Sequence, residues 1–345
     1  MHELENGILV TVIIVSHNDG SWLPRCLESL RTQTLTRQIE VLLADNASSD
    51  GTDQLAQKLI ADWPNARFMS TGGDNGFGVA CNRASERARG KYLYLLNPDT
   101  WAEPDCVEQL YRTAESTRAA AVGSMVLDYD SQVPQGASGI GFDFCGNTLP
   151  SRDVPEVLLS PNSFFFIRRD IFMRLGMMDT KMFMYGEEND LSWRIWIAGE
   201  RIVPALQARI HHRGAVNVNP GGGTPVSQNR TSTQKRFLAN RNRLVFIAKD
   251  CQHLLLLMLL PCLGTVVLEA LATLILARSW RLAKASCIDA VSSFWSLRGH
   301  IRQERRQVAS FRRRGDLWML RFFRFGFGRW AEITKILKTG FPRFR

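Results

Sequence analysis

The chain has 345 residues and is 45% apolar, which suffices for one large α/β domain with an appendage and excludes wholesale disorder. Its seven cysteines form no C-x-x-C pair, so we expect a reducing compartment, without a disulfide framework or a cysteine zinc site. The net charge of +10 is concentrated late in the chain: residues 278–345 hold 17 Lys and Arg against 4 Asp and Glu, and the rest is slightly acidic. Such basic segments bind the phosphates of nucleic acids or lipids.

The first 120 residues alternate between strand-like and helix-like segments. Residues 8–15 (ILVTVIIV) are rich in β-branched side chains, which predicts a strand buried on both faces, and the polar residues 1–6 do not resemble a signal peptide. Further short strands are predicted at residues 39–44, 67–70 and 91–96. Helical spacing follows Leu23 and Thr52. We therefore expect an α/β fold with a mostly parallel open sheet flanked by helices.

Polar residues gather where the predicted strands end. They include Ser16, Asn18, Asp45, Asn46 and Asn97. Ligands of open α/β sheets bind beyond the carboxyl ends of the strands, so we predict that these residues bind the substrate. The carboxylate of Asp45 can accept a hydrogen bond from a pyrimidine N3–H group or from ribose hydroxyls. Alternatively, Asp50 or Ser48 simply caps the next helix, and both functions can hold if Asp45 is the ligand.

A glycine-rich segment, GGDNGFGVACNRA, follows the third predicted strand. It lacks the G-x-G-x-x-G spacing of a dinucleotide fingerprint and does not follow the first strand, which disfavours a hydride-transfer enzyme. Small residues such as Gly76 let the backbone approach a ligand closely, and Asn75 and Asn82 supply polar groups. We predict that these three residues contribute to the same ligand site.

Asp99 lies in the loop LNPDT, directly after the fourth predicted strand. A hard cation such as Mg²⁺ or Mn²⁺ needs few protein oxygens when a diphosphate supplies the others, so one carboxylate here can be sufficient. The alternative is an ordinary turn, because Asn, Pro and Asp all favour turns. We predict that Asp99 is a metal ligand.

After residue 120 the pattern is less regular. Strands are predicted at residues 120–127, 163–168, 202–204 and 208–212. Residues 136–155 and 217–233 are predicted to be loops, because glycine and proline are frequent there.

The acidic segment YGEEND places Glu187, Glu188 and Asp190 within four positions, ahead of an apparently amphipathic helical pattern at residues 191–199. Carboxylates are stabilised at a helix N-terminus, but three like charges repel one another unless a cation or a shared proton relieves them. One of the three can act as a general base, and we assign that role to Glu188 with Asp190 in support. Alternatively, Asp190 pairs with Arg194 at i,i+4 spacing. Our central hypothesis is that this acidic segment and Asp99 enclose one metal-bound anionic substrate.

His211 and His212 follow a short apolar run. A neutral imidazole is a common ligand for ions such as Mn²⁺, although a histidine at a strand edge is often purely structural. Consecutive strand residues point to opposite faces, so only one of the two histidines is expected to face the site.

The C-terminal part is both apolar and basic. Residues 236–250 predict a basic amphipathic helix, and residues 254–277 form an apolar run long enough to cross a bilayer. Because basic residues flank this run on both sides, a re-entrant or surface-lying segment fits better than a single crossing. Aromatic residues alternate with arginines after residue 311, as in interfacial helices. We predict a catalytic domain at residues 1–235 and a membrane-associating region at residues 236–345.

In order along the chain, the motifs VTVIIVSHND, LLADNASSDGT, DNGFGVACNRA, LLNPDT, FMYGEENDLSWRIWIAG and HHRG resemble the family 2 inverting glycosyltransferases of the GT-A fold, in particular the rhamnosyltransferase-like branch. The resemblance covers roughly residues 10–215. It implies a nucleotide-sugar donor, a divalent cation (Mg²⁺ or Mn²⁺) and direct displacement at the anomeric carbon.

Carried over by position, Asp45 resembles the acid that binds the base or ribose, Asp99 the metal ligand of a D-x-D motif, Glu188 the catalytic carboxylate, and His211 or His212 the histidine that faces the diphosphate. Three positions depart from the family pattern: Asn97 replaces the first Asp, Asn189 replaces a small apolar residue, and Val216 replaces a frequent Ser.

The resemblance further implies a dTDP- or UDP-sugar donor, with rhamnose favoured, and a glycan or polyprenyl-diphosphate-linked acceptor at the cytoplasmic face of the plasma membrane. Galactofuranosyl, glucosyl and N-acetylhexosaminyl transfer remain alternatives. From another class, the basic aromatic tail suits a nucleic-acid-binding module, but the adjoining apolar run has no role there, so we expect a membrane partner and no nucleic acid. A non-catalytic scaffold is the third possibility.

Overall fold

The computed structural model describes residues 7–134, 139–151, 165–214 and 230–330, together with residues 334, 338, 343 and 344. The chain divides into two compact units. The first comprises Met1–Gly139, Ser151–Phe183 and Glu200–Arg213, and the second comprises Ile140–Pro150, Met184–Gly199 and Gly214–Arg345. The contacts thus divide the chain within the predicted domain of residues 1–235, because the acidic segment packs with the C-terminal helices.

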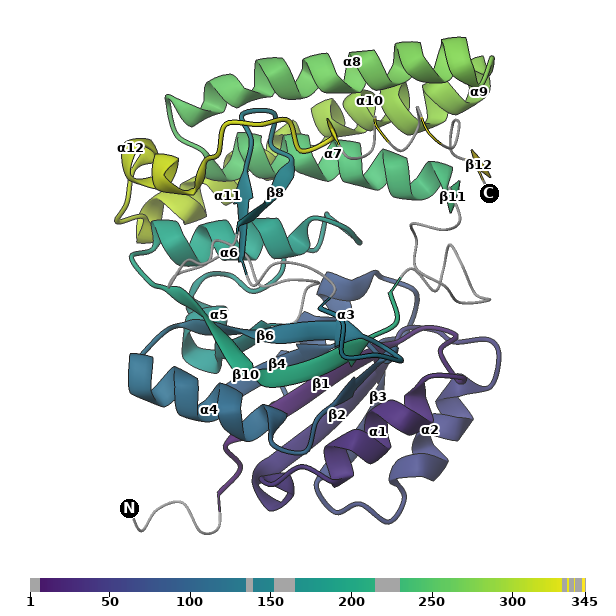
Figure 1. The fold of residues 1–345 in the computed structure, drawn as a ribbon, viewed down its shortest axis with the longest axis vertical. Helices are drawn as coiled ribbons and strands as arrows, with labels where there is room; N and C mark the ends of the chain where they lie inside the picture. The colour runs from purple at the N-terminus through teal and green to yellow at the C-terminus, as the bar shows by residue number, and fades with distance from the viewer. Residues whose placement is uncertain are drawn as a thin grey trace. The chain divides into compact units, whose positions relative to one another are not determined.

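An eight-stranded sheet forms the centre of the first unit (Figure 1). Its strands, in spatial order, are β3 (Ala66–Ser70), β2 (Ile39–Asp45), β1 (Val10–Ser16), β4 (Tyr92–Leu96), β9 (Phe165–Arg168), β6 (Ala121–Asp128), β10 (Ile202–His212) and β5 (Thr100–Ala102). The predicted parallel pairing is confirmed for β1 with β2 and β4, and for β2 with β3, and β6 also pairs in parallel with β10. The sheet is nevertheless mixed, because β9 runs antiparallel to β4 and β6, and β5 runs antiparallel to β10.

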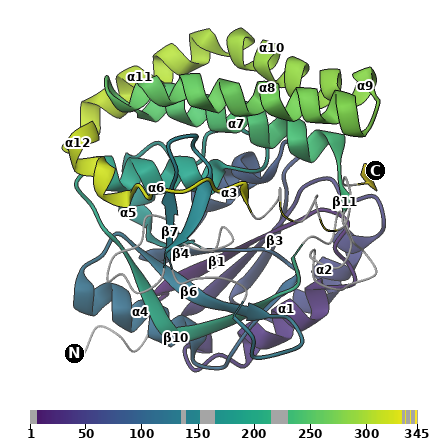
Figure 2. The same cartoon turned by 45° about the horizontal axis from the view of Figure 1, so that its top comes forward.

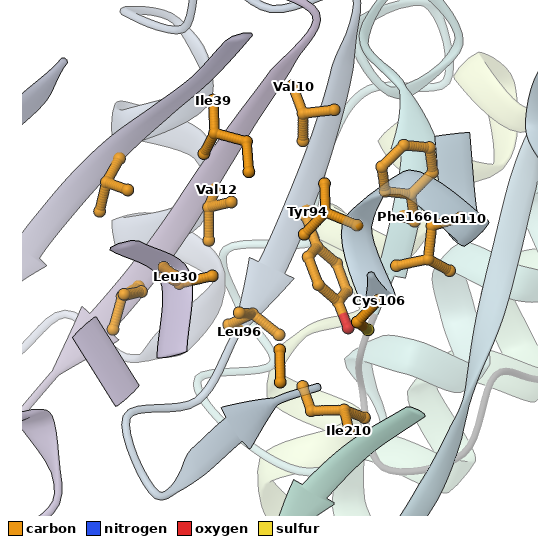
Figure 3. Packing of buried hydrophobic residues seen from close by; sticks show 14 of the residues in the cluster. Val10, Val12, Leu30, Ile39, Tyr94, Leu96, Cys106, Leu110, Phe166 and Ile210 are labelled. Carbon is orange, nitrogen blue, oxygen red and sulfur yellow. The ribbon is translucent and has the colours of Figure 1, made fainter. Parts of the chain in front are cut away.

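The helices α1 (Leu23–Arg31), α2 (Thr52–Ile60) and α4 (Cys106–Thr117) cover one face of this sheet. Alternate residues of the strands enter the shared core, where Tyr94 lies near Leu110 and Phe166, and Val12 lies near Ile39 and Leu30 (Figure 3). The helices α3 (Phe77–Ser85) and α5 (Arg169–Arg174) complete the unit, with a short 3₁₀ turn at Thr36–Gln38. This layered packing fixes the carboxyl ends of β1, β2 and β4, from which the candidate site is built.

Two predictions for the middle of the chain are wrong. Within residues 136–155, the predicted loop contains the paired strands β7 (Gly139–Phe142) and β8 (Thr148–Ser151), because Asp143 accepts hydrogen bonds from the backbone of Cys145 and Asn147 and so stabilises a tight turn. The two strands predicted near residues 202–212 are one strand, β10, with a register shift between Ala205 and Arg209. Most of the loop predicted at residues 217–233 lies outside the described residues.

Helices make up most of the second unit (Figure 2). They are α6 (Glu187–Ile197), α7 (Thr233–Asp250), α8 (Leu259–Leu276), α9 (Trp280–Ala283), α10 (Asp289–Ser296), α11 (Arg298–Phe311) and α12 (Asp316–Met319). The unit also contains short 3₁₀ turns at Leu255–Met258 and Leu320–Phe322 and a π-helical turn at Lys284–Ile288. Two short strands, β11 (Arg230–Thr231) and β12 (Arg343–Phe344), pair with each other.

The aromatic tail supplies core residues to this unit. Phe322 and Phe323 are buried, and their rings contact Trp196 and Trp193 of α6, with centroids 4.7 and 6.1 Å apart. The prediction of one interfacial helix after residue 311 is therefore wrong for these aromatic residues. The helix α6 is also not amphipathic, because every residue from Asp190 to Ile197 is buried and two turns of consecutive residues cover all sides of a helix.

Candidate functional site

In the first unit, Asn46 joins the ends of β1, β2 and β3 through its side chain and its backbone. Its amide oxygen accepts hydrogen bonds from Thr71 Oγ1 (2.9 Å) and the Asn75 backbone (3.2 Å), and its amide nitrogen donates to Asp74 (2.9 Å). The Asn46 backbone N–H also donates to the carbonyl of Ser16 (2.8 Å). Ser16, Asn46 and Asn75 therefore lie together, as their positions at strand ends predict.

Asp45 and Ser16 each present a buried polar atom in this region. Asp45 Oδ2 accepts a hydrogen bond from the Ser48 backbone (3.1 Å), whereas Asp45 Oδ1 and Ser16 Oγ have no hydrogen-bond partner among the described residues. Asn18 accepts a hydrogen bond from the Ser49 backbone (2.8 Å) and lies in the same cluster. Because buried polar groups are nearly always hydrogen-bonded, the two open oxygens indicate a ligand position.

Of the two residues that could cap the next helix, Asp50 bonds the first residue of α2, whose N-cap position is held by Gly51. Asp50 Oδ1 accepts a hydrogen bond from the Thr52 backbone (3.0 Å) where α2 begins. Ser48 Oγ accepts one from the backbone of Asn18 (3.0 Å). Asp50 therefore bonds the start of α2, Ser48 instead joins the loops after β1 and β2, and the role of Asp45 as a ligand stays a prediction.

The contacts of Gly76 and Asn82 do not support their predicted role as ligands. A Cβ atom on Gly76 would lie 2.4 Å from the carbonyl oxygen of Phe183, so the glycine allows a close approach of protein backbone. The amide of Asn82 donates to the carbonyl of Met178 and accepts from its backbone N–H, both at 2.9 Å. Both residues thus fix the segment around residues 178–183 against α3.

Asp99 and His212 meet at one edge of the sheet. β5 begins one residue after Asp99 and pairs antiparallel with the end of β10, so that Thr100 lies opposite His212. The Arg213 backbone N–H donates to the carbonyl of Asp99 (2.9 Å), and His212 Nε2 lies 3.5 Å from Asp99 Oδ2. Asn97 begins this turn, and its carbonyl accepts a hydrogen bond from Thr100 Oγ1 (2.7 Å).

His211 has a different environment, as the alternation along a strand predicts. Its ring stacks on Trp101 with centroids 3.6 Å apart. Its Nδ1 is 2.8 Å from the carbonyl of Asp128, and its Nε2 is 3.3 Å from Glu103 Oε1. Both ring nitrogens of His211 are therefore occupied, and of the two histidines only His212 lies beside Asp99.

The donor atoms at this edge suit a divalent cation. A carboxylate oxygen and an imidazole nitrogen are both ligands of Mn²⁺, and Mg²⁺ accepts the former. Among the residues that the structure describes, no group of three or more His, Cys, Asp or Glu side chains could hold a metal. A cation at Asp99 and His212 would therefore need further ligands from a bound diphosphate and water.

In the second unit, α6 begins with Glu187 and Glu188. Glu188 Oε2 accepts a hydrogen bond from the backbone of Gly186 (3.0 Å), and burial raises the pKa of Glu188. Burial, reinforced by the charge of Glu188, raises the pKa of Glu187 to about 8. Two adjacent carboxyl groups with raised pKa values are suited to proton transfer near neutral pH.

A buried ion network lies behind these carboxyl groups, between α6 and α7. Asp190 Oδ2 accepts a hydrogen bond from Arg194 Nε (3.0 Å), which confirms the i,i+4 pair, and Asp190 Oδ1 pairs with Lys249 Nζ. All three side chains are almost fully buried. Burial, followed by the charge of Asp190, raises the pKa of the adjacent Asp250. Removal of one partner would leave an uncompensated buried charge, so this network holds the first turn of α6 in place.

Sequence reasoning missed Asn242, a buried residue of α7. Its amide nitrogen donates to the carbonyls of Met184 (2.9 Å) and Tyr185 (2.7 Å). Tyr185 and Gly186 both have positive φ values, 69° and 95°, which are costly for the tyrosine. Asn242 thus fixes the turn that presents Glu187 and Glu188, and no local pattern in the sequence signals this contact.

The raised pKa of Glu187 predicts a pH dependence of stability. Between the ordinary glutamate pKa and about pH 8, the folded protein holds a proton on Glu187 that the unfolded chain releases. Stability should therefore fall as the pH rises from roughly 5 to 8, by up to about 1.4 kcal/mol per pH unit. Glu187→Gln should flatten this slope in denaturant titrations, and Glu28→Gln, at an exposed position, should not. An unchanged slope in Glu187→Gln would contradict the raised pKa.

Comparisons with known proteins match the chain to one family and to one type of fold. Residues 11–176 match the family described as glycosyl transferase family 2. The N-acetylglucosaminyl-diphospho-decaprenol L-rhamnosyltransferase of Mycobacterium tuberculosis (strain CDC 1551 / Oshkosh) is 29% identical over 266 residues, which cover 68% of this chain and 85% of that protein.

Two solved structures share the fold. GalNAc-T7 with UDP, GalNAc and Mn²⁺ has a TM-score of 0.64 at 15% identity, over 99% of this chain and 60% of that chain. S. aureus TarS 1-349 in complex with UDP has a TM-score of 0.54 at 16% identity, over 88% of both chains. These likenesses establish the GT-A type of fold.

Proposed function

The chain belongs to glycosyl transferase family 2, and we propose that it transfers a sugar, with inversion, from a dTDP- or UDP-sugar to a hydroxyl group of a glycan or a polyprenyl-diphosphate-linked acceptor. One observation carries this proposal most directly: Asp99 and His212, from distant parts of the chain, lie 3.5 Å apart at the carboxyl end of β4. Family membership makes the enzyme a nucleotide-sugar glycosyltransferase, and the roles of individual residues are proposals.

Asp45 would bind the nucleoside of the donor. Its Oδ1 is a buried hydrogen-bond acceptor without a partner among the described residues. Uracil and thymine both carry an N3–H donor on their base-pairing edge that could fill this position. Ser16 Oγ, buried beside it, can donate to the same ligand. Asn46 and Asn75 would hold the surrounding loops in shape through the hydrogen bonds that they already make.

Asp99 and His212 would hold the divalent cation together with the diphosphate of the donor. When bound, the cation would neutralise negative charge on the nucleoside diphosphate as it leaves. The related fold with bound UDP and Mn²⁺ supports a requirement for a divalent cation, and we favour Mn²⁺ or Mg²⁺ because the donor set combines a carboxylate with an imidazole.

Glu188 would act as the general base. Its carboxylate would accept the proton of the acceptor hydroxyl while that oxygen bonds to the anomeric carbon and the bond from this carbon to the diphosphate oxygen breaks. A raised pKa makes the carboxylate a stronger base than an exposed one. Glu187 would serve as a neighbouring proton carrier, and Asp190 would support the position of both through Arg194 and Lys249. The acidic helix and the Asp99 turn belong to different compact units, so their action on one donor is part of the proposal.

Rhamnose is the favoured sugar, because a relative that overlaps most of the chain is a rhamnosyltransferase with a lipid-linked substrate. Galactofuranosyl, glucosyl and N-acetylhexosaminyl donors are the alternatives. A membrane-bound acceptor would place the enzyme at the cytoplasmic face of the plasma membrane. Nucleic-acid binding is disfavoured, because the exposed apolar face of α8 has no role in it, and Phe322 and Phe323 of the basic tail pack against Trp196 and Trp193 and cannot stack on bases.

A thermal-shift screen of nucleotide-sugars tests the proposal. dTDP-rhamnose with Mn²⁺ or Mg²⁺ should raise the melting temperature by several degrees, and the same sugar nucleotide with EDTA should raise it less, because ligand binding to the folded state stabilises it. UDP-galactofuranose, UDP-glucose and UDP-N-acetylglucosamine are the competing donors. A chain that no sugar nucleotide stabilises, with or without metal, would contradict the proposed function.

A further inference from the structure

The helix α8 turns its polar side chains toward the protein. Cys262, Thr265 and Thr273 are buried on one face, at helical spacing with Glu269. Thr265 Oγ1 accepts a hydrogen bond from Arg243 (3.0 Å) on α7. Figure 2 shows α8 running alongside α7. This face is therefore bound to the rest of the unit.

Glu269 holds the middle of α8 in place through two ion pairs. It pairs with Arg236 of α7 (3.4 Å) and with Arg329 near the end of the chain. Burial alone would raise the pKa of Glu269, but the two guanidinium groups outweigh it and hold the pKa below its ordinary value. The carboxylate is thus charged and its partners belong to the protein.

The opposite face of α8 and the turn before it is an exposed apolar stripe. We call it the α8 stripe: Leu257, Leu260, Val267, Leu268, Leu271 and Ile275. These side chains are 48–71% exposed, and at 100° per residue the positions 257, 260, 267, 268, 271 and 275 all fall within about one third of the helix circumference. A stripe of this length is unusual on a protein surface in water and marks a surface that binds an apolar partner.

Length alone would permit this segment to cross a membrane, since Leu255–Leu276 forms a continuous apolar helix of 22 residues. A crossing would surround the whole helix with lipid. It would therefore separate Glu269 from Arg236 and Arg329, or draw these charges into the hydrocarbon layer, and both are costly. A helix that lies in the plane of the membrane keeps the ion pairs and buries only the stripe.

The charges around the stripe indicate which surface covers it. Arg278 and Arg281 follow α8 and are exposed, and the exposed Trp280 between them offers an amphipathic ring suited to the headgroup layer. Lys284 is also exposed, and it pairs with Asp289 (2.7 Å). Cations beside an apolar stripe match a bilayer with anionic lipids. A second copy of this chain is a poorer partner, because it would bring the same cations against one another.

We propose that α8 docks lengthwise on the surface of an anionic phospholipid bilayer, with the α8 stripe and Trp280 in the interface and Arg278 and Arg281 on lipid phosphates. The docking would hold the enzyme beside a lipid-linked acceptor, and this purpose, though not the docking itself, rests on the proposed function.

The first experiment tests the α8 stripe with the full chain and vesicles of phosphatidylcholine, with or without phosphatidylglycerol, in a flotation assay. Leu268→Glu combined with Leu271→Glu should weaken binding to anionic vesicles about tenfold or more, because two charges would have to enter the apolar layer. The matched control Leu206→Glu changes a leucine of the first unit that is 50% exposed, against 48% for Leu271, and should bind normally. Undiminished binding by the double variant would overturn the proposal.

The second experiment tests the basic residues and the in-plane orientation. Arg278→Gln combined with Arg281→Gln should weaken binding to the phosphatidylglycerol vesicles by roughly 25-fold, about fivefold for each arginine, and leave binding to phosphatidylcholine unchanged. Alkaline carbonate should release the unchanged protein from vesicles, because a surface-bound helix does not traverse the bilayer. Retention after carbonate treatment would show a spanning helix and overturn the proposal.

Two further readouts separate this docking from the proposed function and from self-association. The Leu268→Glu, Leu271→Glu variant should keep the nucleotide-sugar thermal shift of the unchanged protein, since it lies outside the donor site. If vesicle binding holds and no nucleotide-sugar binds, the proposed function fails and the docking stands. If the unchanged protein ignores vesicles but is a dimer that this variant dissociates, a second copy covers the stripe and the docking proposal is wrong.

Discussion

Replacement of Asp99 by alanine is expected to abolish sugar transfer and the metal-dependent part of donor binding. Asp99 supplies the carboxylate beside His212, and we expect the cation to be lost without it. The negative charge that develops on the leaving diphosphate would then not be neutralised. Groups that stabilise such charge contribute factors of about 10² to 10³ each, and loss of a whole cation should cost more. We would measure the donor dissociation constant by calorimetry with Mn²⁺ and with EDTA, and turnover by release of nucleoside diphosphate.

The matched control is Asp130→Ala, which removes an exposed carboxylate from the same unit. Within the part of the chain that the structure describes, the ion pairs of Asp130 are long, at 3.9 Å with Arg25 and 3.8 Å with Arg213, so its loss should leave turnover and donor binding nearly unchanged. If Asp99→Ala binds the donor as tightly with Mn²⁺ as the unchanged protein does, the cation is held elsewhere and the assignment of Asp99 is wrong.

Glu188→Gln should separate chemistry from binding. The glutamine has nearly the shape of the glutamate but cannot accept the proton of the acceptor hydroxyl, so kcat should fall by about 10² to 10⁴. Donor affinity and melting temperature should remain close to those of the unchanged protein, because the glutamine oxygen can still accept the hydrogen bond that the Gly186 backbone N–H donates to Glu188. Single-turnover transfer to an acceptor, measured by rapid quenching, isolates this step from product release.

Glu187→Gln is the companion variant. Glu187 is adjacent to Glu188 in the first turn of α6. The proposed reaction needs one base, which is Glu188, so replacement of Glu187 should reduce kcat far less. The charge of Glu188 helps to raise the pKa of Glu187, so the two carboxyl groups titrate together. Replacement of either glutamate should therefore shift the pH at which the remaining one titrates. Near-normal transfer by Glu188→Gln would move the role of base to Glu187 or Asp190.

The sheet and its ligand-binding edge could be predicted because their signals are local. A β-branched run such as residues 10–16 indicates a buried strand whatever surrounds it, and polar residues directly after a strand must lie at its carboxyl end. Strand alternation predicts that only one of His211 and His212 faces the site, but not which one. The structure then selected His212, because the antiparallel pairing with β5 could not be read from the sequence.

Other features depend on contacts between distant segments. Lys249 looks like one more cation before the apolar run, yet it pairs with Asp190 inside the second unit. Similarly, Gly76 suggests a ligand loop, whereas its neighbour is the carbonyl of Phe183. The pattern of residues in α6 cannot reveal that two aromatic residues of the tail pack against its Trp193 and Trp196. In each case the missing information is the identity of a remote partner.

The most direct test asks whether two acidic segments perform separate tasks on the same donor. One nucleotide-sugar is titrated by calorimetry, with Mn²⁺ present, into the Asp99→Ala protein and into the Glu188→Gln protein. The expected result is a binding isotherm like that of the unchanged enzyme for the glutamine variant, which transfers no sugar, and a greatly weakened isotherm for the alanine variant. Equal loss of affinity in both proteins, or full affinity in both, would contradict this division of labour.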